Sequence, residues 1–105
     1  MNNINTNTKF SSRCYNLVSK VPIGKITTYG EIARILNTKG YRAVGNAMAN
    51  NPNLFTIPCH RVIKSDGSIG QYSKGENSKI KLLIKEGIPI TNGKIKDLSK
   101  YIFTF

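Results

Sequence analysis

Apolar residues recur at helical spacing in four stretches of this chain, and each stretch predicts an amphipathic helix. The first predicted helix begins near Phe10 and is ended by Pro22 and Gly24. Its apolar stripe consists of Phe10, Cys14, Leu17, Val18 and Val21. The preceding residues 1–8 are polar, and we expect them to be disordered.

A second helix is predicted after Thr28, which with Glu31 has the spacing of a capping box. Its buried face is expected to consist of Ile32, Ala33, Ile35 and Leu36. A third helix is predicted over residues 41–50, with a core side made of Ala43, Val44, Ala47 and Met48. Two short helices joined by a turn that contains Gly40 are typical of a helix-turn-helix.

The second half of the chain predicts less helix and more turn. Val62-Ile63 and Ser68-Ile69, separated by a Lys-Ser-Asp-Gly turn, predict a short hairpin or wing. A last helix is expected to open at Ser78 and to end at Gly87, with an inward face made of Ile80, Leu82, Leu83 and Ile84. The tail, residues 88–105, is expected to form a second hairpin and to fold back on the core through Tyr101, Ile102 and Phe103. These elements predict a mainly α, winged helix-turn-helix-like domain.

Length and composition favour one globular domain over residues 1–105. Hydrophobic residues make up 39% of the chain and charged residues 20%, enough apolar material for a single core. No apolar run approaches the roughly 20 residues that a membrane-spanning helix needs, and the amino terminus has no apolar signal segment. We therefore expect a soluble, cytoplasmic protein.

The charge balance points to an anionic partner. Sixteen Lys and Arg residues against five Asp and Glu give a formal net charge of +11. Such an excess is typical of proteins that bind nucleic acid, although it also serves solubility alone. The predicted third helix presents Arg42, Gly45, Asn46 and Ala49 opposite its core side, a face that could enter a DNA groove or pack on another helix.

Cys59 is the candidate nucleophile. It follows Pro58 and precedes His60, the only histidine, whereas Cys14 lies on an apolar helix stripe and is expected in the core. Two cysteines are too few for a disulfide scaffold, and with one histidine they do not form a structural zinc site, so we expect no metal and no cofactor. The alternative for Cys59 is a buried, inert thiol.

A histidine that acts as a base usually needs a group to orient it, and the chain offers five acids. Glu31 is assigned to the capping box and Asp66 to a turn. Glu86 closes the last predicted helix, where the helix dipole disfavours a carboxylate. That position favours a buried role for Glu86, although a solvated helix-end carboxylate is the alternative.

Five ordered motifs over residues 9–88 resemble the C-terminal domain of the O6-alkylguanine-DNA alkyltransferases. They are TYGEIA from Thr28, RAVGNAM from Arg42 with Asn51-Pro52, IPCHRV from Ile57, GQYS from Gly70 and LLIKEG from Leu82. The resemblance implies an active-site loop that carries Cys59 as the alkyl acceptor. Cys59 would take the alkyl group from O6-alkylguanine in DNA, and by extension from O4-alkylthymine, in one irreversible turnover.

The resemblance also assigns roles to the neighbours of Cys59. His60 matches the residue that takes the thiol proton through a water, and Glu86 matches the acid that orients its imidazole. Asn51 matches a hinge residue between the third helix and the active-site loop. Tyr29 matches the residue that crowds the 3′ phosphate of the target nucleotide and donates to the departing guanine.

The remaining correspondences concern DNA and the flipped base. Arg42 matches a finger that fills the gap left by the flipped nucleotide, while the small residues Gly45, Ala47 and Ala49, with Asn46, let the third helix enter the minor groove. Val62 matches a backbone contact to the guanine edge, and Tyr72 and Ser73 match the lid of the base pocket. The partner implied is double-stranded DNA that contains O6-alkylguanine, bound by a monomer; cooperative binding is left open.

Two departures from the family pattern leave an alternative open. Only about eight residues precede the first predicted helix, where the family usually has another domain, and Lys74 stands where Gly is common. The short length is similar to that of alkyltransferase-like proteins, which bind the lesion without repairing it and lack the acceptor cysteine. Cys59 separates the two readings. A winged-helix transcription regulator, the third possibility, gives no reason for the IPCHRV motif.

Overall fold

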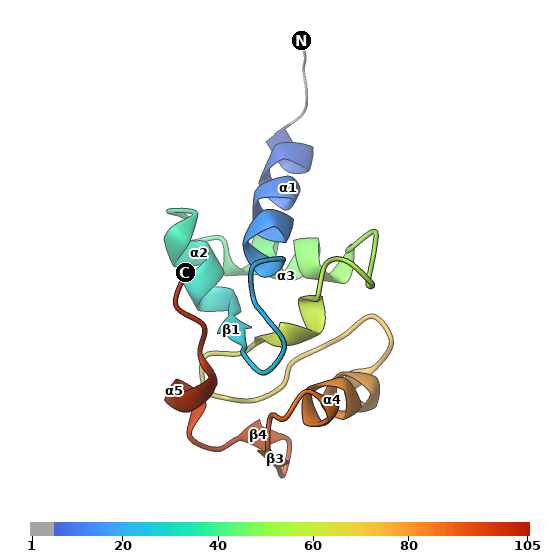
Figure 1. Cartoon of the computed structure of the whole chain (residues 1–105). Helices are drawn as coiled ribbons and strands as arrows, with labels where there is room; N and C mark the ends of the chain where they lie inside the picture. Colours follow the sequence, from blue (N-terminus) through green and yellow to red (C-terminus); the bar gives the residue numbers. More distant parts are fainter. Residues whose placement is uncertain (1–5) are drawn as a thin grey trace.

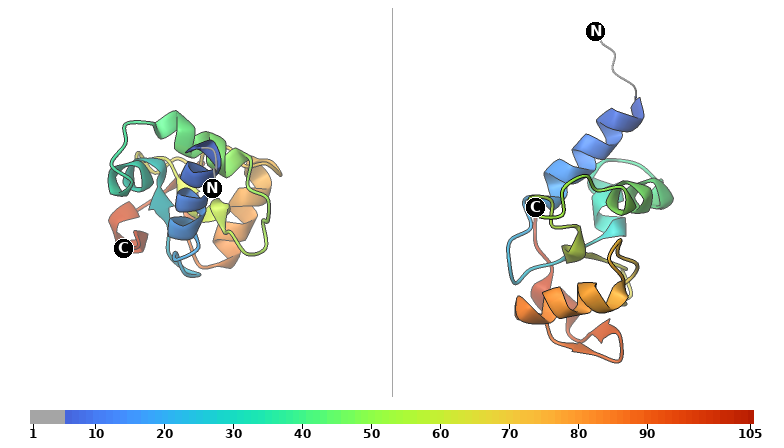
Figure 2. Two further views of the ribbon diagram at one scale, coloured as in Figure 1. Left: turned by 90° about the horizontal axis from the view of Figure 1, so that it is seen from above. Right: turned by 90° about the vertical axis from the view of Figure 1, so that its right-hand side faces the viewer.

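The computed structural model describes residues 6–105 and is mainly helical. Figure 1 shows the first three helices in one half of the molecule and the last two, with a hairpin, in the other. The right-hand view of Figure 2 shows the same division. The helices are α1 (Thr6–Val18), α2 (Tyr29–Ile35), α3 (Tyr41–Ala49), α4 (Glu76–Lys85) and α5 (Leu98–Tyr101). The strands are β1 (Thr27–Thr28), β2 (Val62–Ile63), β3 (Ile90–Thr91) and β4 (Lys94–Ile95).

Helix α1 begins earlier than the apolar pattern predicts. Residues 6–8, expected to be disordered, form its first turn, while residues 1–5 lie outside the described residues. The start of this helix was predicted from its first apolar residue. That rule misses a first turn made of polar residues, and Thr and Asn are well tolerated at the start of a helix. Along α1, Cys14 and Val18 are fully buried, as predicted for the apolar stripe.

Helices α2 and α3 form the predicted helix-turn-helix, and α1 packs against both. The hydroxyl of Thr28 accepts a hydrogen bond from the backbone N–H of Glu31 at 3.0 Å, which confirms the predicted cap. In a complete capping box the Glu31 side chain would also reach back to the backbone N–H of Thr28. Its carboxylate instead accepts hydrogen bonds from Arg34 at 2.8 and 2.9 Å. The assignment of the Glu31 side chain to the cap was therefore wrong.

The turn of the predicted wing is present, but the strand partner of β2 was not predicted. Strand β2 pairs in parallel with β1, with Thr27 opposite Val62 and Thr28 opposite Ile63. After a tight turn, in which Gly67 has a φ of +90°, the chain does return beside the end of β2, because the backbone N–H of Lys64 donates to the carbonyl of Ser68 at 3.0 Å. Ser68 also forms a bridge to Lys94 of the second hairpin. The parallel pair joins the start of α2 to the segment that follows Cys59, so it fixes the two regions relative to each other.

The carboxyl-terminal residues behave largely as predicted. Strands β3 and β4 form an antiparallel hairpin around Asn92 and Gly93, whose φ values of +53° and +73° suit a tight primed turn. The backbone of Ile26 pairs with the end of the chain, donating to Tyr101 and accepting from Phe103 at 2.9 and 2.8 Å. A second apolar cluster lies here and contains Ile26, Ile63, Ile69, Leu83, Ile88 and Ile95.

Two predicted core positions, Ala43 and Ile84, are exposed in the structure. Ala43 is exposed, because α3 turns it away from α1 and α2. Ile84 is 54% exposed, whereas Lys79 on the same helix is fully buried. Helix α4 begins at Glu76, two residues before the predicted Ser78, because Gly75 with a φ of +95° breaks the preceding chain. Within residues 6–105, no helix is long and apolar enough to cross a membrane.

Candidate functional site

Cys59 lies in a tight turn between the two halves of the molecule. It begins the 3₁₀ turn Cys59–Arg61, which follows α3 and a loop and leads directly into β2. The backbone N–H of Cys59 donates to the carbonyl of Ile57 at 2.8 Å, and that of Arg61 donates to Pro58 at 2.9 Å. The Cys59 side chain is 5% exposed. Such a turn is what the adjacent residues 59 and 60 need in order to act together.

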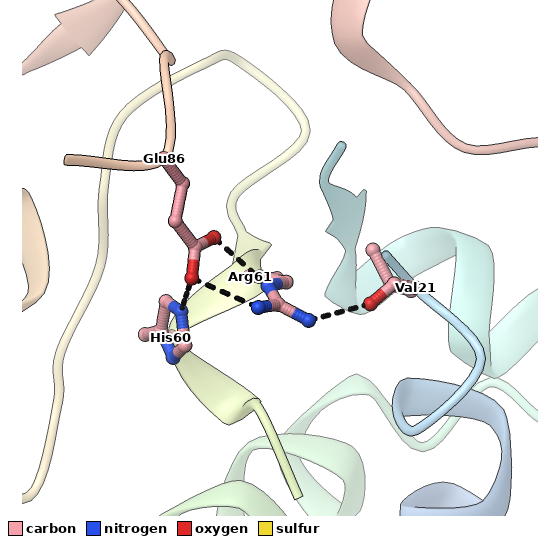
Figure 3. Close-up of polar contacts among 4 residues, drawn as sticks. All are labelled: Val21, His60, Arg61 and Glu86. Atoms are coloured by element: carbon pink, nitrogen blue, oxygen red, sulfur yellow. Dashed lines mark hydrogen bonds and ion pairs between the residues drawn. The ribbon is translucent and has the colours of Figure 1, made fainter. Parts of the chain in front are cut away.

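Glu86 binds both residues that follow Cys59. His60 Nε2 lies 2.9 Å from Glu86 Oε2, and Arg61 makes a two-point contact at 2.9 and 2.8 Å (Figure 3). A third nitrogen of Arg61 donates to the carbonyl of Val21 at 2.7 Å. Glu86 caps the carboxyl end of α4 and is brought here because α4 packs against the turn. The buried role predicted for Glu86 matches this geometry, whereas the contribution of Arg61 was not predicted.

The hydrogen-bond partners fix the proton of His60. An ionised carboxylate only accepts hydrogen bonds, so His60 Nε2 carries a proton toward Glu86 and Nδ1 is left as the acceptor. Burial lowers the pKa of His60, and the hydrogen bond to Glu86 opposes that effect. Burial by itself would raise the pKa of Glu86, but hydrogen bonds from Arg61 and His60 hold it below its usual value. At neutral pH this arrangement is a neutral imidazole, able to accept a proton, beside an ionised carboxylate.

Asn51 ties the loop that leads to Cys59. Its side-chain amide donates to the carbonyl of Ile57 at 2.7 Å, and its side-chain oxygen accepts from the backbone N–H of Asn53 at 2.8 Å. These two bonds close the segment from the end of α3 to Pro58. Asn51 therefore holds the position of the Cys59 turn.

Cys59 opens onto a cavity of about 550 Å³ at the outer face of α3. Other predicted site residues line it with Cys59: Tyr29, Arg42, Gly45, Asn46, Ala49, Tyr72 and Ser73. A Cβ atom built on Gly45 meets nothing within 4 Å, so packing inside the protein does not require a glycine there. Arg42, Asn46 and Ala49 are exposed on this face, which leaves it open to another molecule.

The other predicted site residues lie behind this cavity. His60 is 7% exposed, and Glu86 lies beyond it. Val62 is fully buried, and its carbonyl oxygen accepts from Lys79 Nζ at 2.7 Å. Asn51 and His60 line a second cavity, of about 670 Å³, together with Tyr72. No group of three or more His, Cys, Asp or Glu side chains within residues 6–105 could hold a metal ion.

Lys79 is the site residue that the sequence analysis missed. Its ammonium group donates to the carbonyls of Val62 and Gln71 at 2.7 and 3.2 Å, and it lies 3.5 Å from the hydroxyl of Tyr29. Burial lowers the pKa of Lys79 to about 8. Its position one helical turn before Leu83, on the inward side of α4, was the signal that could have revealed it.

Comparison with known proteins identifies this arrangement. Residues 9–88 match the family model for the DNA binding domain of 6-O-methylguanine DNA methyltransferase. A bifunctional methyltransferase/endonuclease of Picrophilus torridus is 45% identical over 93 residues, which cover 88% of this chain and 31% of the relative. A methylated-DNA–protein-cysteine methyltransferase of Metallosphaera sedula is 46% identical over 93 residues, 89% of this chain and 58% of the relative.

A solved structure is similar over almost the whole chain. S. pombe Atl1, in complex with damaged DNA containing O6-carboxymethylguanine, superposes with a TM-score of 0.82 at 35% identity. The superposition covers 92% of this chain and 96% of Atl1. By contrast, the chain spans only 31% and 30% of two bifunctional relatives. The superposition with Atl1 thus supports the mainly helical fold with its short strand pair.

Proposed function

The chain belongs to the 6-O-methylguanine DNA methyltransferase family through its DNA-binding domain, and on that premise we propose that it repairs O6-alkylguanine in DNA by transferring the alkyl group to Cys59. It would also accept O4-alkylthymine. The match to the family's motifs extends through the Pro-Cys-His-Arg turn, so we propose that this domain carries the catalytic cysteine as well as the DNA-binding helices.

One observation carries the proposal: Cys59 lines the same cavity as the exposed face of the helix-turn-helix. A base flipped out of a duplex bound at α3 would enter a space that ends at a thiol. Behind that thiol lies an imidazole whose other nitrogen is held by a carboxylate at 2.9 Å. A transcription regulator would need the DNA-binding face but not the buried His60–Glu86 pair.

The proposed reaction is a direct displacement at the alkyl carbon. His60 accepts the Cys59 thiol proton at Nδ1 through a water, and the resulting sulfur anion attacks the carbon attached to O6. The C–S bond forms as the C–O6 bond breaks with its electron pair moving into the guanine. The guanine takes up one proton and leaves as an ordinary base, while Cys59 remains as a thioether. Each protein molecule therefore reacts once.

DNA binding is proposed to use the residues around the cavity mouth. Arg42, at the exposed start of α3, fills the gap left by the flipped nucleotide, and Gly45, Asn46 and Ala49 allow the helix to enter the minor groove. Tyr29 crowds the target's 3′ phosphate and donates to the departing guanine. Its pKa is raised by burial, so the phenol keeps its proton for donation at neutral pH.

The base itself is proposed to be held by backbone and lid groups. Tyr72 and Ser73 lie on the cavity that Cys59 lines and would cover the flipped guanine. The carbonyl of Val62, which accepts a hydrogen bond from Lys79, would contact the guanine edge. Lys79 thereby positions the carbonyl that would read the base.

The second candidate function is lesion binding without transfer. The similarity to Atl1 over 92% of this chain favours it, because the superposed structure holds DNA with an O6-alkylated guanine. Under this hypothesis the protein flags the lesion for nucleotide excision repair. Cys59 argues for transfer, since the residue type that the reaction needs stands at the end of the cavity.

The two candidates differ in what happens to the DNA. We would incubate a duplex carrying one O6-methylguanine with increasing amounts of protein, digest the DNA and quantify the modified base by chromatography. Transfer predicts the loss of one lesion per protein molecule, with no further turnover. The lesion-binding candidate predicts that the duplex is bound and the modified base is recovered intact. Cys14→Ala, a change in the core, serves as a control that should not abolish transfer.

A further inference from the structure

Tyr41 is an exposed aromatic residue beside the cavity that Cys59 lines. It is the first residue of α3, it is 58% exposed, and it lines this cavity together with Arg42 and Tyr29. Other large apolar side chains are exposed elsewhere on the described part of the chain, and none of them lines this cavity: Ile23, Phe55, Ile84 and Phe105. The reaction proposed above gives Tyr41 no role.

The ring of Tyr41 lies against the start of α2. A Cβ atom built on Gly30 would lie 4.0 Å from Cε1 of the Tyr41 ring. Gly30 stands in the first turn of α2 and directly follows Tyr29. The ring therefore lies on the Tyr29 side of the cavity and is supported there by protein backbone, while more than half of the residue stays in contact with solvent. Such support lowers the entropy that the ring loses when a partner packs on it.

Base flipping would supply that partner. A nucleotide that leaves a duplex exposes one face of each neighbouring base, and the lost stacking is part of the cost of flipping. An aromatic side chain placed at the gap restores stacking whatever the sequence, because every base has a π face. Tyr41 precedes Arg42, the residue proposed to fill the gap, and both line the same cavity.

The position of Tyr29 indicates which neighbouring base Tyr41 would reach. Tyr29 is proposed to crowd the 3′ phosphate of the target nucleotide, and the Tyr41 ring lies against the residue that follows Tyr29. The base on the 3′ side of the gap is therefore the one nearest to the ring.

We propose that Tyr41 stacks on the base 3′ of the flipped nucleotide and so stabilises the opened duplex. This inference rests on the proposed function, because it requires a lesion that has left the duplex for the cavity. No bond is made or broken at Tyr41. Its contribution is to the affinity for the lesion duplex and to the stacking of one neighbouring base.

A fluorescent base tests the stack directly. 2-Aminopurine is placed 3′ of a single O6-methylguanine, and the duplex is bound by the full chain with Cys59→Ala, the parent protein here, so that no transfer occurs during the measurement. 2-Aminopurine is quenched while it is stacked and brightens when it loses a stacking partner. We expect it to stay quenched on the parent and to brighten on Tyr41→Leu. With 2-aminopurine on the 5′ side, the two proteins should give the same signal.

The variants separate the ring from its bulk and its hydroxyl. Tyr41→Leu keeps a large apolar side chain without a ring, and it should bind the lesion duplex about five- to tenfold more weakly, the lower end of the effect of one base–aromatic stack. Tyr41→Phe keeps the ring and should bind like the parent. Phe55→Ala removes an aromatic residue that is 99% exposed and lies outside this cavity, and it should leave the affinity unchanged. Because Tyr41 is largely exposed, its variants should fold, and circular dichroism checks this.

The outcomes separate this stack from the proposed transfer. Equal affinity and equal fluorescence of the parent and Tyr41→Leu overturn the stack. A loss in Tyr41→Phe as large as in Tyr41→Leu also overturns it, because the hydroxyl and not the ring would then make the contact. A signal change confined to the 5′ position overturns the assigned base. Transfer is measured separately with Cys59 present: removal of the lesion without a Tyr41 effect would leave only the proposed transfer, and a Tyr41 effect without removal would leave only the stack.

Discussion

The ammonium group of Lys79 donates to the carbonyl oxygen of Val62 at 2.7 Å, across 17 residues of sequence and in the fully buried interior. This contact links α4 to the strand that follows Cys59. The same group lies 3.5 Å from the hydroxyl of Tyr29 at the start of α2. One buried cation thus connects the helix that carries Glu86, the backbone after Cys59 and the mouth of the cavity.

The first prediction concerns the protonation of Lys79. Its pKa is lowered from 10.5 to about 8, so between these values the unfolded chain binds more protons and the free energy of unfolding rises with pH. The contribution from Lys79 between pH 8 and pH 10 is on the order of 2 kcal/mol. Urea denaturation at both pH values measures it as the difference between the parent and Lys79→Met, both in a Cys59→Ala background.

Both proteins lack the Cys59 thiol, so it does not contribute to the difference between them. The parent should gain stability relative to Lys79→Met as the pH rises. A constant difference between the two proteins would mean that burial does not lower the pKa of Lys79 in the folded state.

The second prediction concerns the Glu86 carboxylate. Glu86→Gln leaves the Arg61 side chain, only 12% exposed, without its ion-pair partner. Removing one member of a buried pair strands the other charge, and we expect the free energy of unfolding to fall by about 2 to 4 kcal/mol. Glu31→Gln is the matched control, because its partner Arg34 is solvent-exposed and the loss should be small. Equal effects in the two variants would contradict a buried Arg61–Glu86 pair.

The third prediction concerns the pH dependence of transfer. Burial lowers the pKa of His60 below 6.5, and only the neutral imidazole accepts the thiol proton. The transfer rate constant should therefore be insensitive to His60 titration near pH 7.5 and fall as the pH drops through a midpoint below 6.5. His60→Gln should react more slowly and lose that midpoint. A wild-type midpoint above 6.5, or one retained in His60→Gln, would rule out His60 as the base.

The fourth prediction separates DNA binding from stability at Gly45. A side chain at this position meets open space, and replacing glycine inside a helix favours folding by about 0.5 to 1 kcal/mol. Gly45→Leu should thus fold at least as stably as the wild type, yet bind duplex DNA at least about tenfold more weakly, because its side chain fills the face that enters the groove. Fluorescence anisotropy measures the affinity, and Gly45→Ala should show the smaller loss. Unchanged affinity in Gly45→Leu would place DNA elsewhere.

Local rules predicted the helical half of this fold and much of the site. The Thr28 cap and the turn at Gly40 located α2 and α3, because capping and turn residues act within a few positions. The β1–β2 pair was missed because each strand has two residues and the pairing joins positions 35 apart, which leaves no periodic signal. The bridge between Ser68 and Lys94 was likewise missed, because it joins the turn to a distant hairpin.

Within the site, pairwise contacts between distant residues were the difficult part. The residues alone singled out Glu86 by its unfavourable helix-end position, but its contact with Arg61 arises because α4 packs against the Cys59 turn. Lys79 was overlooked because a lysine is normally exposed, and only the tertiary structure supplies the carbonyl oxygens that compensate its burial. Ile84 was placed in the core because an isoleucine is normally buried, whereas here it is exposed.

The most direct test of the account is the mass of the protein and of its Cys59 peptide after reaction with duplex DNA that carries one O6-methylguanine. We predict a gain of one methylene per chain, located on Cys59 and absent in Cys59→Ala. Tight binding of the duplex with no gain in mass, or a methyl group found on Cys14 instead, would contradict Cys59 as the alkyl acceptor.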